Sequence, residues 1–270
     1  MNIHPTAIVS PKAQLADDVE VGPQAIIGDN VVIGAGSVVM ARAIIEGYTT
    51  LGTGNTVGYG AIIGTPPQDF AFKPETRTDV RIGNNNTFRE YVTIHRGTKE
   101  GSATVVGDDC YLMVAAHLGH NVSLGNKVVI ANNCALGGYV EVHDGAVLGG
   151  GNVFHQFMRI GKMAMVRGGT RFGKDIPPYA MGDEDNILAG INAIGLRRAG
   201  VPSETRLEIK RVYREYFRSG LNFGQALAKI KESTWSPMVQ EFISFVESSK
   251  RGICPMHQSK GNRGEDEAGE

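Results

Sequence analysis

Two histidines, His117 and His120, stand three residues apart in the segment LMVAAHLGHNVSL, which carries almost no other reactive side chain. A histidine can remove a proton as a general base, because its ordinary pKa lies close to neutral pH. It can also bind a metal ion such as zinc. A lone histidine is more often structural than catalytic, so the chemistry of this pair depends on what the fold places beside it.

The segment lies within a repeat of six residues. Aliphatic residues occupy every sixth position from Ile3 to Ile63, and the pattern resumes in a shifted phase at Ile82 and runs, with one gap at Glu100, to Phe172. A period of six fits neither a helix nor the simple alternation of an open sheet. It fits a short strand followed by a turn, with the aliphatic side chain pointing inward. Three such units predict a triangular coil of about 18 residues, and the coils stack at about 4.8 Å.

The stacking of coils converts sequence separation into spatial proximity. Residues one coil apart form columns along one edge of the prism, and the columns around the histidine pair are His120–Gly138–Gln156, Asn121–Tyr139 and Gly119–Gly137–His155. A base would then lie beside backbone N–H groups that no side chain covers. This is the arrangement that acyl transfer needs, because the imidazole removes a proton while an N–H group stabilises the oxyanion.

Two segments interrupt the repeat, and helix signals follow it. GTPPQDFAFKPETRTDVR and RGTKEGSAT are polar or proline-rich and are expected to leave the coil as loops. Ser203, Asn222 and Ser236-Pro237 each open a stretch with a helical pattern of apolar residues. The sequence predicts a β-helix over residues 1–182 with loops at 64–81 and 96–104, an α-helical domain over 183–252 and a disordered tail over 253–270.

The bulk properties exclude several classes of protein. A formal net charge of −1 over 270 residues argues against a nucleic-acid or general membrane binder. No apolar run is long enough to span a bilayer, and the first residues lack the pattern of a signal peptide. The three cysteines show no paired spacing, which favours a reducing compartment. We therefore expect a cytoplasmic protein that binds no nucleic acid and has no integral membrane segment.

A closer resemblance rests on motifs that occur in order along the chain: PPQDF, TIHRGT, LMVAAHLGH, FHQF, DIPPY and INAIGLRRAG. With the hexapeptide repeat, they resemble the UDP-N-acetylglucosamine acyltransferases that begin lipid A synthesis. The resemblance implies an all-β left-handed parallel β-helix followed by a small α-helical C-terminal domain. It also implies a homotrimer that moves an (R)-3-hydroxyacyl group from acyl carrier protein to the 3-position of the nucleotide-sugar. No cofactor and no metal are expected.

The resemblance also implies roles for individual residues. His120 would be the general base, and the Gly138 N–H the oxyanion donor. The implied substrate contacts are Asp69, Lys73, His117, Asn121, Tyr139, His155, Gln156, Gly168, Asn192 and Arg198. Among these, Asp69 and His117 would position the sugar, Asn192 and Arg198 would contact the phosphate or uridine end, and Gly168 would leave room for a long acyl chain.

The chain departs from the family pattern at four positions. Asn121 stands where an aspartate usually follows the catalytic histidine, Tyr139 stands where a histidine is often found, and Arg167 stands where a glycine is expected. The loop lysine, Lys73, comes four residues after Asp69 instead of two. The changes at Asn121, Tyr139 and Lys73 lie where the sugar would be recognised. The acceptor therefore remains either the 3-hydroxy sugar or its 3-amino analogue. Arg167 leaves the acyl length open.

Three alternative functions compete with this interpretation. A carbonic anhydrase built on the same repeat needs three zinc-binding histidines in a fixed spacing, which the columns above do not supply. An acyl-CoA-dependent hexapeptide transferase would not be expected to carry a long helical C-terminus. A purely structural solenoid would have no accessible histidine beside a glycine backbone.

Overall fold

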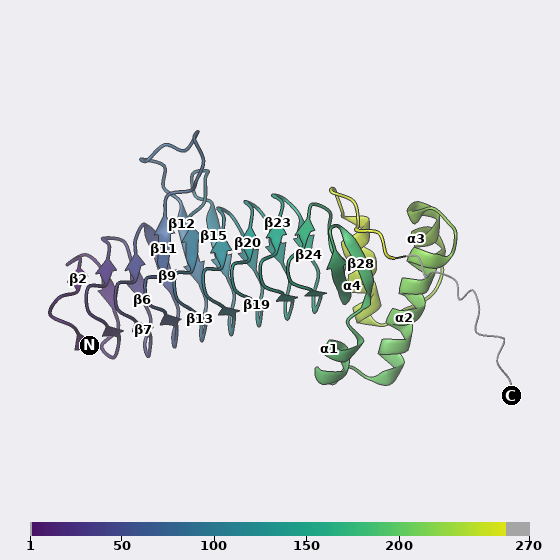
Figure 1. Ribbon diagram of the computed structural model, residues 1–270, viewed down its shortest axis with the longest axis horizontal. Helices are drawn as coiled ribbons and strands as arrows, with labels where there is room; N and C mark the ends of the chain where they lie inside the picture. Colours follow the sequence, from purple (N-terminus) through teal and green to yellow (C-terminus); the bar gives the residue numbers. More distant parts are fainter. Residues whose placement is uncertain (1, 258–270) are drawn as a thin grey trace, which may run out of the picture.

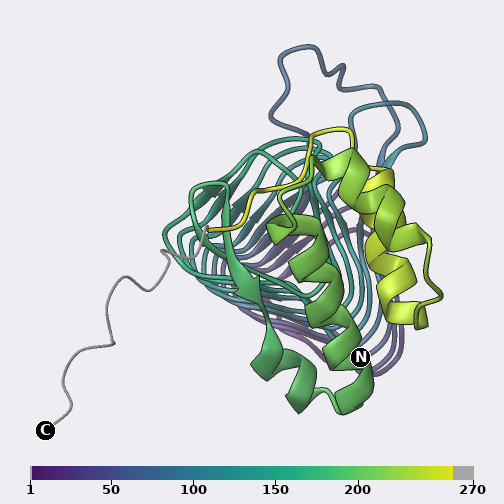
Figure 2. The ribbon, with the colours of Figure 1, turned by 90° about the vertical axis from the view of Figure 1, so that its right-hand side faces the viewer.

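The hexads fold as short strands that wind around a triangular prism. The computed structural model describes residues 2–257. Its β-helix is left-handed, and its coils stack along one long axis with the helices at the C-terminal end (Figure 1). Seen along that axis, the prism is triangular, and two loops leave it at one corner (Figure 2). The fold class predicted from the sequence is confirmed.

Each side of the prism is one sheet. The first face has eleven strands: β1 (Asn2–Ile3), β4 (Glu20–Val21), β7 (Val38–Val39), β10 (Thr56–Val57), β13 (Thr87–Phe88), β16 (Tyr111–Leu112), β19 (Val129–Ile130), β22 (Val147–Leu148), β25 (Met165–Val166), β27 (Ala180–Glu184) and β28 (Ile187–Ile191). All pairs in this face are parallel except the hairpin β27–β28.

The second face has nine strands: β2 (Ile8–Val9), β5 (Ile26–Ile27), β8 (Ile44–Ile45), β11 (Ile62–Thr65), β14 (Thr93–His95), β17 (His117–Leu118), β20 (Ala135–Leu136), β23 (Val153–Phe154) and β26 (Arg171–Phe172). The third face has eight: β3 (Gln14–Leu15), β6 (Val32–Ile33), β9 (Tyr48–Leu51), β12 (Asp79–Ile82), β15 (Ala103–Val106), β18 (Ser123–Leu124), β21 (Glu141–Val142) and β24 (Arg159–Ile160).

The register follows the predicted coil length. His117 pairs with Ala135 and Leu118 with Leu136, so in each pair the partner lies three hexads further along the chain. Tyr48 pairs with Asp79, which lies more than three hexads on, because the first loop lengthens its coil. That loop occupies residues 66–78, shorter than the expected 64–81, since β11 and β12 extend into both ends of the predicted segment. The second loop occupies residues 96–102 instead of the expected 96–104, because β15 begins at Ala103.

The core is the aliphatic column that the repeat predicts. From Val21 onward its inward residues are buried, for example Ile33, Leu118 and Ile160. Ile3 lies in the first coil, at the N-terminal end of the prism, and is 38% exposed because no further coil covers it. The burial of this continuous column is the main apolar term that stabilises the stack.

Four helices follow the β-helix: α1 (Ala193–Arg198), α2 (Ser203–Arg218), α3 (Phe223–Lys231) and α4 (Pro237–Glu247). Asn222 caps α3 and forms a capping box with Gln225, so the N-cap predicted from the sequence at Asn222 is confirmed. Ser203 is instead the first residue of α2, whose N-cap is Pro202, so the predicted cap is displaced by one residue. Within residues 2–257, no helix has the length and apolarity needed to cross a bilayer.

The tail begins later than predicted. Ile253 and Cys254 are buried, and Cys254 N–H donates to the carbonyl of Asp175 at 2.9 Å, so residues 253–257 pack on the end of the prism. The prediction of disorder is wrong for this segment, because apolar burial and main-chain pairing fix it. Residues 258–270 lie outside the described part of the chain. The boundary that we predict at residue 182 falls within β27, and the division into two domains stays a prediction.

Candidate active site

One edge of the prism collects most of the predicted site residues. It is the edge between the second and third faces, from which both loops also leave (Figure 2). Tyr139 N–H donates to the His120 carbonyl at 3.0 Å, and Phe157 N–H donates to the Gly138 carbonyl at 3.0 Å. These bonds stack consecutive coils, so that His120, Gly138 and Gln156 form the column that the spacing predicts.

The His120 imidazole lies directly against Gly138. A Cβ atom at position 138 would be 2.3 Å from His120 Cε1 and 2.4 Å from Nε2, so only glycine leaves the ring in this place. Among residues 2–257, no carbonyl or side chain accepts a hydrogen bond from the Gly138 N–H. An imidazole therefore adjoins a main-chain N–H that has no acceptor among these residues, the pair of groups that general-base attack on a carbonyl requires. Gly138 itself is buried and does not line the cavity in front of His120.

A hydrogen-bonded network surrounds the other nitrogen of His120. His120 Nδ1 lies 3.2 Å from Asn121 Oδ1. The same oxygen lies 3.1 Å from both the main-chain nitrogen and the Oγ1 atom of Thr98, in the second loop. Thr98 Oγ1 is also 3.0 Å from the Tyr139 hydroxyl. The network joins Thr98 of the second loop to His120 and to Tyr139 in the next coil.

His117 is the first residue of β17, on the second face. Its Nδ1 is 2.8 Å from Thr93 Oγ1, and its ring lies 5.3 Å from that of His95. Burial lowers the pKa of His117, and the neighbouring His95 adds to this effect. His117 is therefore neutral near neutral pH, with Nε2 left for a further hydrogen bond.

A cavity of about 510 Å³ opens in front of the network around His120. It is lined by Gln68, Asp69, Phe70, Thr98, Lys99, His120, Tyr139, Gln156 and Phe157. The Tyr139 and Phe157 rings are stacked at 4.9 Å and form one apolar wall. A cleft with a base, a charged side chain and an aromatic wall is the usual form of a small-molecule site.

Several lining residues were missed by the reasoning from sequence. Thr98, Lys99, Gln68 and Phe70 lie in the two loops, and Phe157 follows Gln156 in its corner. Phe157 could have been found, because it lies one coil beyond Tyr139 in the same column. The loop residues follow no repeat, so their positions were not available from the spacing.

Of the two site residues predicted in the first loop, one lines the cavity and the other does not. Asp69 lines the cavity, and its Oδ1 accepts a hydrogen bond from the Ala71 N–H at 2.9 Å. Lys73 is exposed and does not line the cavity, whereas Lys99 of the second loop does. His155 is exposed at the same edge, with Nδ1 3.2 Å from the Gln156 carbonyl.

Three predicted residues lie away from this edge. Gly168 belongs to the corner between the first and second faces, where it packs on the Gly150 carbonyl. Asn192 caps α1 and donates to the Met163 carbonyl at 3.0 Å, at the third edge, and Arg198 ends the same helix. Within one chain, these residues and His120 do not form a single site.

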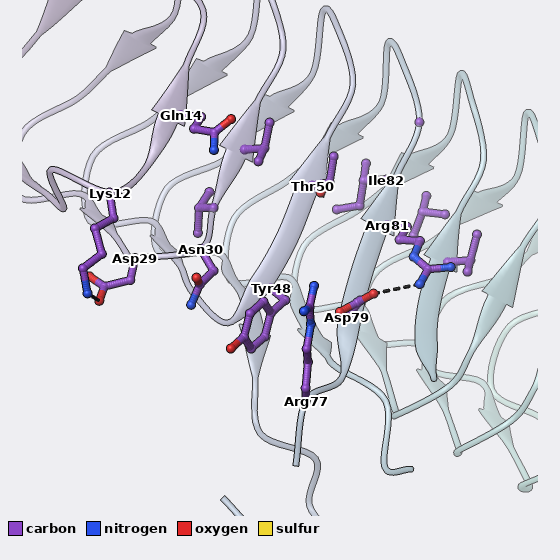
Figure 3. A pocket seen from close by; sticks show the side chains of 15 residues that line it. Lys12, Gln14, Asp29, Asn30, Tyr48, Thr50, Arg77, Asp79, Arg81 and Ile82 are labelled. Carbon is purple, nitrogen blue, oxygen red and sulfur yellow. Dashed lines mark hydrogen bonds and ion pairs between the residues drawn. The ribbon is translucent and has the colours of Figure 1, made fainter. Parts of the chain in front are cut away.

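A larger cavity of about 750 Å³ lies elsewhere, on the third face near the N-terminus (Figure 3). Four of its five charged residues form ion pairs, Lys12 with Asp29 at 2.9 Å and Arg81 with Asp79 at 2.7 Å. Arg77 stacks over the Tyr48 ring at 4.7 Å. No histidine lines it, so it offers no imidazole as a base.

A left-handed prism of hexapeptide coils is the architecture of the hexapeptide-repeat acyltransferases, and the fold assigns the chain to this class. A family model described as UDP N-acetylglucosamine O-acyltransferase, domain 2, matches residues 175–254. An acyl-[acyl-carrier-protein]–UDP-N-acetylglucosamine O-acyltransferase of Syntrophobacter fumaroxidans is 46% identical over 94% of this chain and 99% of its own length. One of Halorhodospira halophila is 45% identical over 93% and 98%.

Solved structures agree. The UDP-N-acetylglucosamine acyltransferase of Francisella novicida superposes with a TM-score of 0.90 at 35% identity and covers 95% of each chain. That of Campylobacter jejuni gives 0.89 at 32% identity and covers 95% of this chain and all of its own. The chain belongs to the family of UDP-N-acetylglucosamine O-acyltransferases, as the sequence motifs predicted.

Proposed function

We propose that the protein transfers an (R)-3-hydroxyacyl group from acyl carrier protein to the 3-position of UDP-N-acetylglucosamine, or of its 3-amino analogue, as the first step of lipid A synthesis. Relatives that share 44–46% of its residues over nearly the whole chain are named for this acyl transfer. The observation that carries the mechanism is the His120 imidazole against the glycine corner at Gly138.

The reaction follows from that contact. His120 Nε2 removes the proton of the acceptor hydroxyl or amine as it attacks the thioester carbonyl. The negative charge that develops on the carbonyl oxygen accepts a hydrogen bond from the Gly138 N–H. When the tetrahedral intermediate collapses, the carbon–sulfur bond breaks, and the imidazolium returns its proton to the leaving thiolate. The acyl carrier thiol is thereby released, and His120 is regenerated without any cofactor.

The remaining site residues are assigned by their position. Asp69 and Gln156 would hold the sugar, because they line the cavity in front of His120. His117 would do so from β17, three residues before His120 in the same coil. Burial lowers the pKa of His117, so its ring is neutral near neutral pH. The ring would therefore form a hydrogen bond to a sugar hydroxyl through Nε2 and would not supply a positive charge. Lys99 occupies the place at the cavity that we expected for Lys73. His155 would meet the nucleotide end of the acceptor.

We further propose that the working unit is a homotrimer in the cytoplasm. Gly168, Asn192 and Arg198 lie on other edges than His120 and would join its cleft only from a neighbouring copy. The three cysteines are free and buried, which suits a reducing compartment. Within residues 2–257 of one chain, no group of three potential ligands could hold a metal ion.

The test is a transfer assay. The purified protein is incubated with UDP-N-acetylglucosamine or its 3-amino analogue and a panel of 3-hydroxyacyl carrier proteins, and products are read by mass. We expect one acceptor to gain one hydroxyacyl group, and His120→Ala to remove turnover while the protein stays folded. Equal rates with acyl-CoA donors would favour the CoA-dependent transferase. Full activity of His120→Ala would show that another group is the base.

A further inference from the structure

An amide, not a carboxylate, stands beside the base. Asn121 can present either its oxygen or its NH₂ group to His120 Nδ1. If the NH₂ group faced Nδ1, the imidazole would have to carry its proton on Nε2, and no lone pair would point into the cleft. In a serine protease, an amide in place of the carboxylate selects this wrong tautomer and lowers kcat by about 10⁴-fold. The chain must therefore fix the orientation of the Asn121 amide.

Thr98 provides that orientation. Its main-chain N–H can only donate, and it lies 3.1 Å from Asn121 Oδ1, so the atom facing it must be the amide oxygen. The same oxygen is 3.2 Å from His120 Nδ1, which must then be the protonated nitrogen. Nε2 is left unprotonated beside Gly138, where the base is needed.

The side chain of Thr98 adds a second donor. Its Oγ1 has one proton, and the bond to Asn121 Oδ1 at 3.1 Å uses it. The Tyr139 hydroxyl, 3.0 Å away, then donates to Thr98 Oγ1. All donors along this chain point toward the amide oxygen. These directions agree with one another, and the Asn121 oxygen accepts each bond that Thr98 and His120 direct at it.

The loop that carries Thr98 is itself anchored. Gly101 N–H donates to the Arg77 carbonyl at 2.9 Å, and Glu100 accepts from the Arg77 N–H at 3.0 Å, so the second loop is tied to the first. Asn121 N–H donates to Thr104 Oγ1 at 2.8 Å, which holds the backbone of the corner. None of these three contacts involves the Asn121 side-chain amide, so the orientation of the amide depends on Thr98.

We infer that Thr98, supported by Tyr139, is a positioning residue that holds the Asn121 amide with its oxygen toward His120 and so keeps the base in its active tautomer. The inference rests on the proposed role of His120. It also assigns Asn121 and Tyr139 to the base, whereas the family resemblance placed them at the sugar.

A double-mutant cycle tests the inference through kcat. Thr98→Val removes the hydroxyl donor and leaves the main-chain N–H, so one of the two Thr98 bonds to the amide oxygen is lost, and we expect kcat to fall about fivefold with KM nearly unchanged. Thr98→Ser, which keeps the hydroxyl, should restore the rate. In an Asn121→Asp background, Thr98→Val should cost less than about twofold, because a carboxylate has no donor end to present. An equal loss in both backgrounds would mean that Thr98 only holds the loop, and the inference would be wrong.

The tautomer can be read without turnover. In protein labelled with ¹⁵N-histidine, the signals lost in His120→Ala identify that ring, and at alkaline pH we expect a protonated Nδ1. In Thr98→Val, the Nε2–H form should become detectable. A wild-type ring protonated on Nε2 would refute the inference. A wild-type protein without transfer activity would refute the proposed function instead, and the spectrum would still decide the tautomer.

Discussion

Gly138 shows how little space the candidate site leaves. A methyl group there would overlap the His120 ring, which can turn away because it is the far end of a side chain. We therefore expect Gly138→Ala to fold with nearly normal stability and to lose about 100-fold or more in kcat, since a shift of about 1 Å can cost that much. A transfer assay measures the expected loss in kcat, and a thermal melt measures the expected stability.

The matched control is Gly224→Ala. Its new methyl group would meet only Asn222 Oδ1, at 3.5 Å, in the exposed first turn of helix α3. We expect this variant to transfer acyl groups at the wild-type rate. If Gly138→Ala retained full activity, the close contact between residues 120 and 138 would have no catalytic meaning.

His117 makes the folded chain sensitive to acid. Because burial holds its pKa below the ordinary 6.5, the unfolded chain binds a proton more readily than the folded one. Stability should be unaffected well above pH 6.5 and should fall as the pH drops through that value, until the folded pKa is passed. His143 is shifted in the same direction by burial and should add to the loss.

Urea unfolding at about pH 8 and about pH 5 measures this effect. The free energy of unfolding should fall less in His117→Gln than in the wild type, and likewise in His143→Gln. A loss of the same size in all three proteins would show that neither histidine carries the proton linkage.

The residues of the site differ in how far the sequence could predict them. His120 and Gly138 were found together because the strands repeat once in every coil of three hexads, and hydrogen bonds between coils leave no other register. Thr98 and Lys99 were not found, since the loop at 96–102 follows no period and its path depends on contacts with the other loop. The orientation of Asn121 also required coordinates.

At the scale of elements, one buried ion pair joins the prism to the helices. Asp175, with a side chain 1% exposed, accepts from the Arg159 guanidinium at 2.9 Å and from the Ser249 hydroxyl at 2.8 Å. The same guanidinium donates to the Phe245 carbonyl and lies 4.3 Å from the Phe245 ring in α4. This cluster links β24 to the end of α4.

We expect Asp175→Ala to lower the free energy of unfolding by about 3 kcal/mol or more, because it leaves a mostly buried guanidinium without its partner. A thermal or urea melt measures the loss. The control is Asp29→Ala, which breaks a pair whose side chains are 73% and 55% exposed and should not move the melting midpoint. Equal midpoints for all three proteins would show that the helices are held by packing alone.

The helices were predicted less well than the strands. Asn222 was recognised as a cap because its side chain and that of Gln225 satisfy each other locally. Residues 253–257 were not recognised as ordered, because their stability comes from distant partners such as Asp175 and Leu188. Local signals predict local structure, and a short segment that packs against a remote coil gives none.

At the scale of the whole molecule, the spread of site residues over three edges predicts a shared site. In a trimer, each cleft would take His120 from one copy and Arg198 from another. If inactive His120→Ala and Arg198→Ala chains are mixed in equal amounts and reassemble at random, about a quarter of the clefts should contain both native residues. Activity close to that fraction, with a trimeric mass by light scattering, is the expected result.

A mixture that stays inactive while forming mixed trimers would place both residues in the cleft of a single copy. A monomeric mass would refute the trimer itself. The unmixed variants serve as the matched controls, because each must be inactive alone for the mixture to be informative.

The two ends of the prism are unlike. The last coil is covered by helices and by residues 253–257, whereas β1, β2 and β3 each pair on one side only, and Ile8 is 66% exposed. Because each coil touches only its neighbours, local opening should start at the first coil and advance along the axis. Amide protons should exchange with deuterium soonest near Ile8 and progressively later toward His120, so that fraying at the uncovered end leaves the coil around His120 folded.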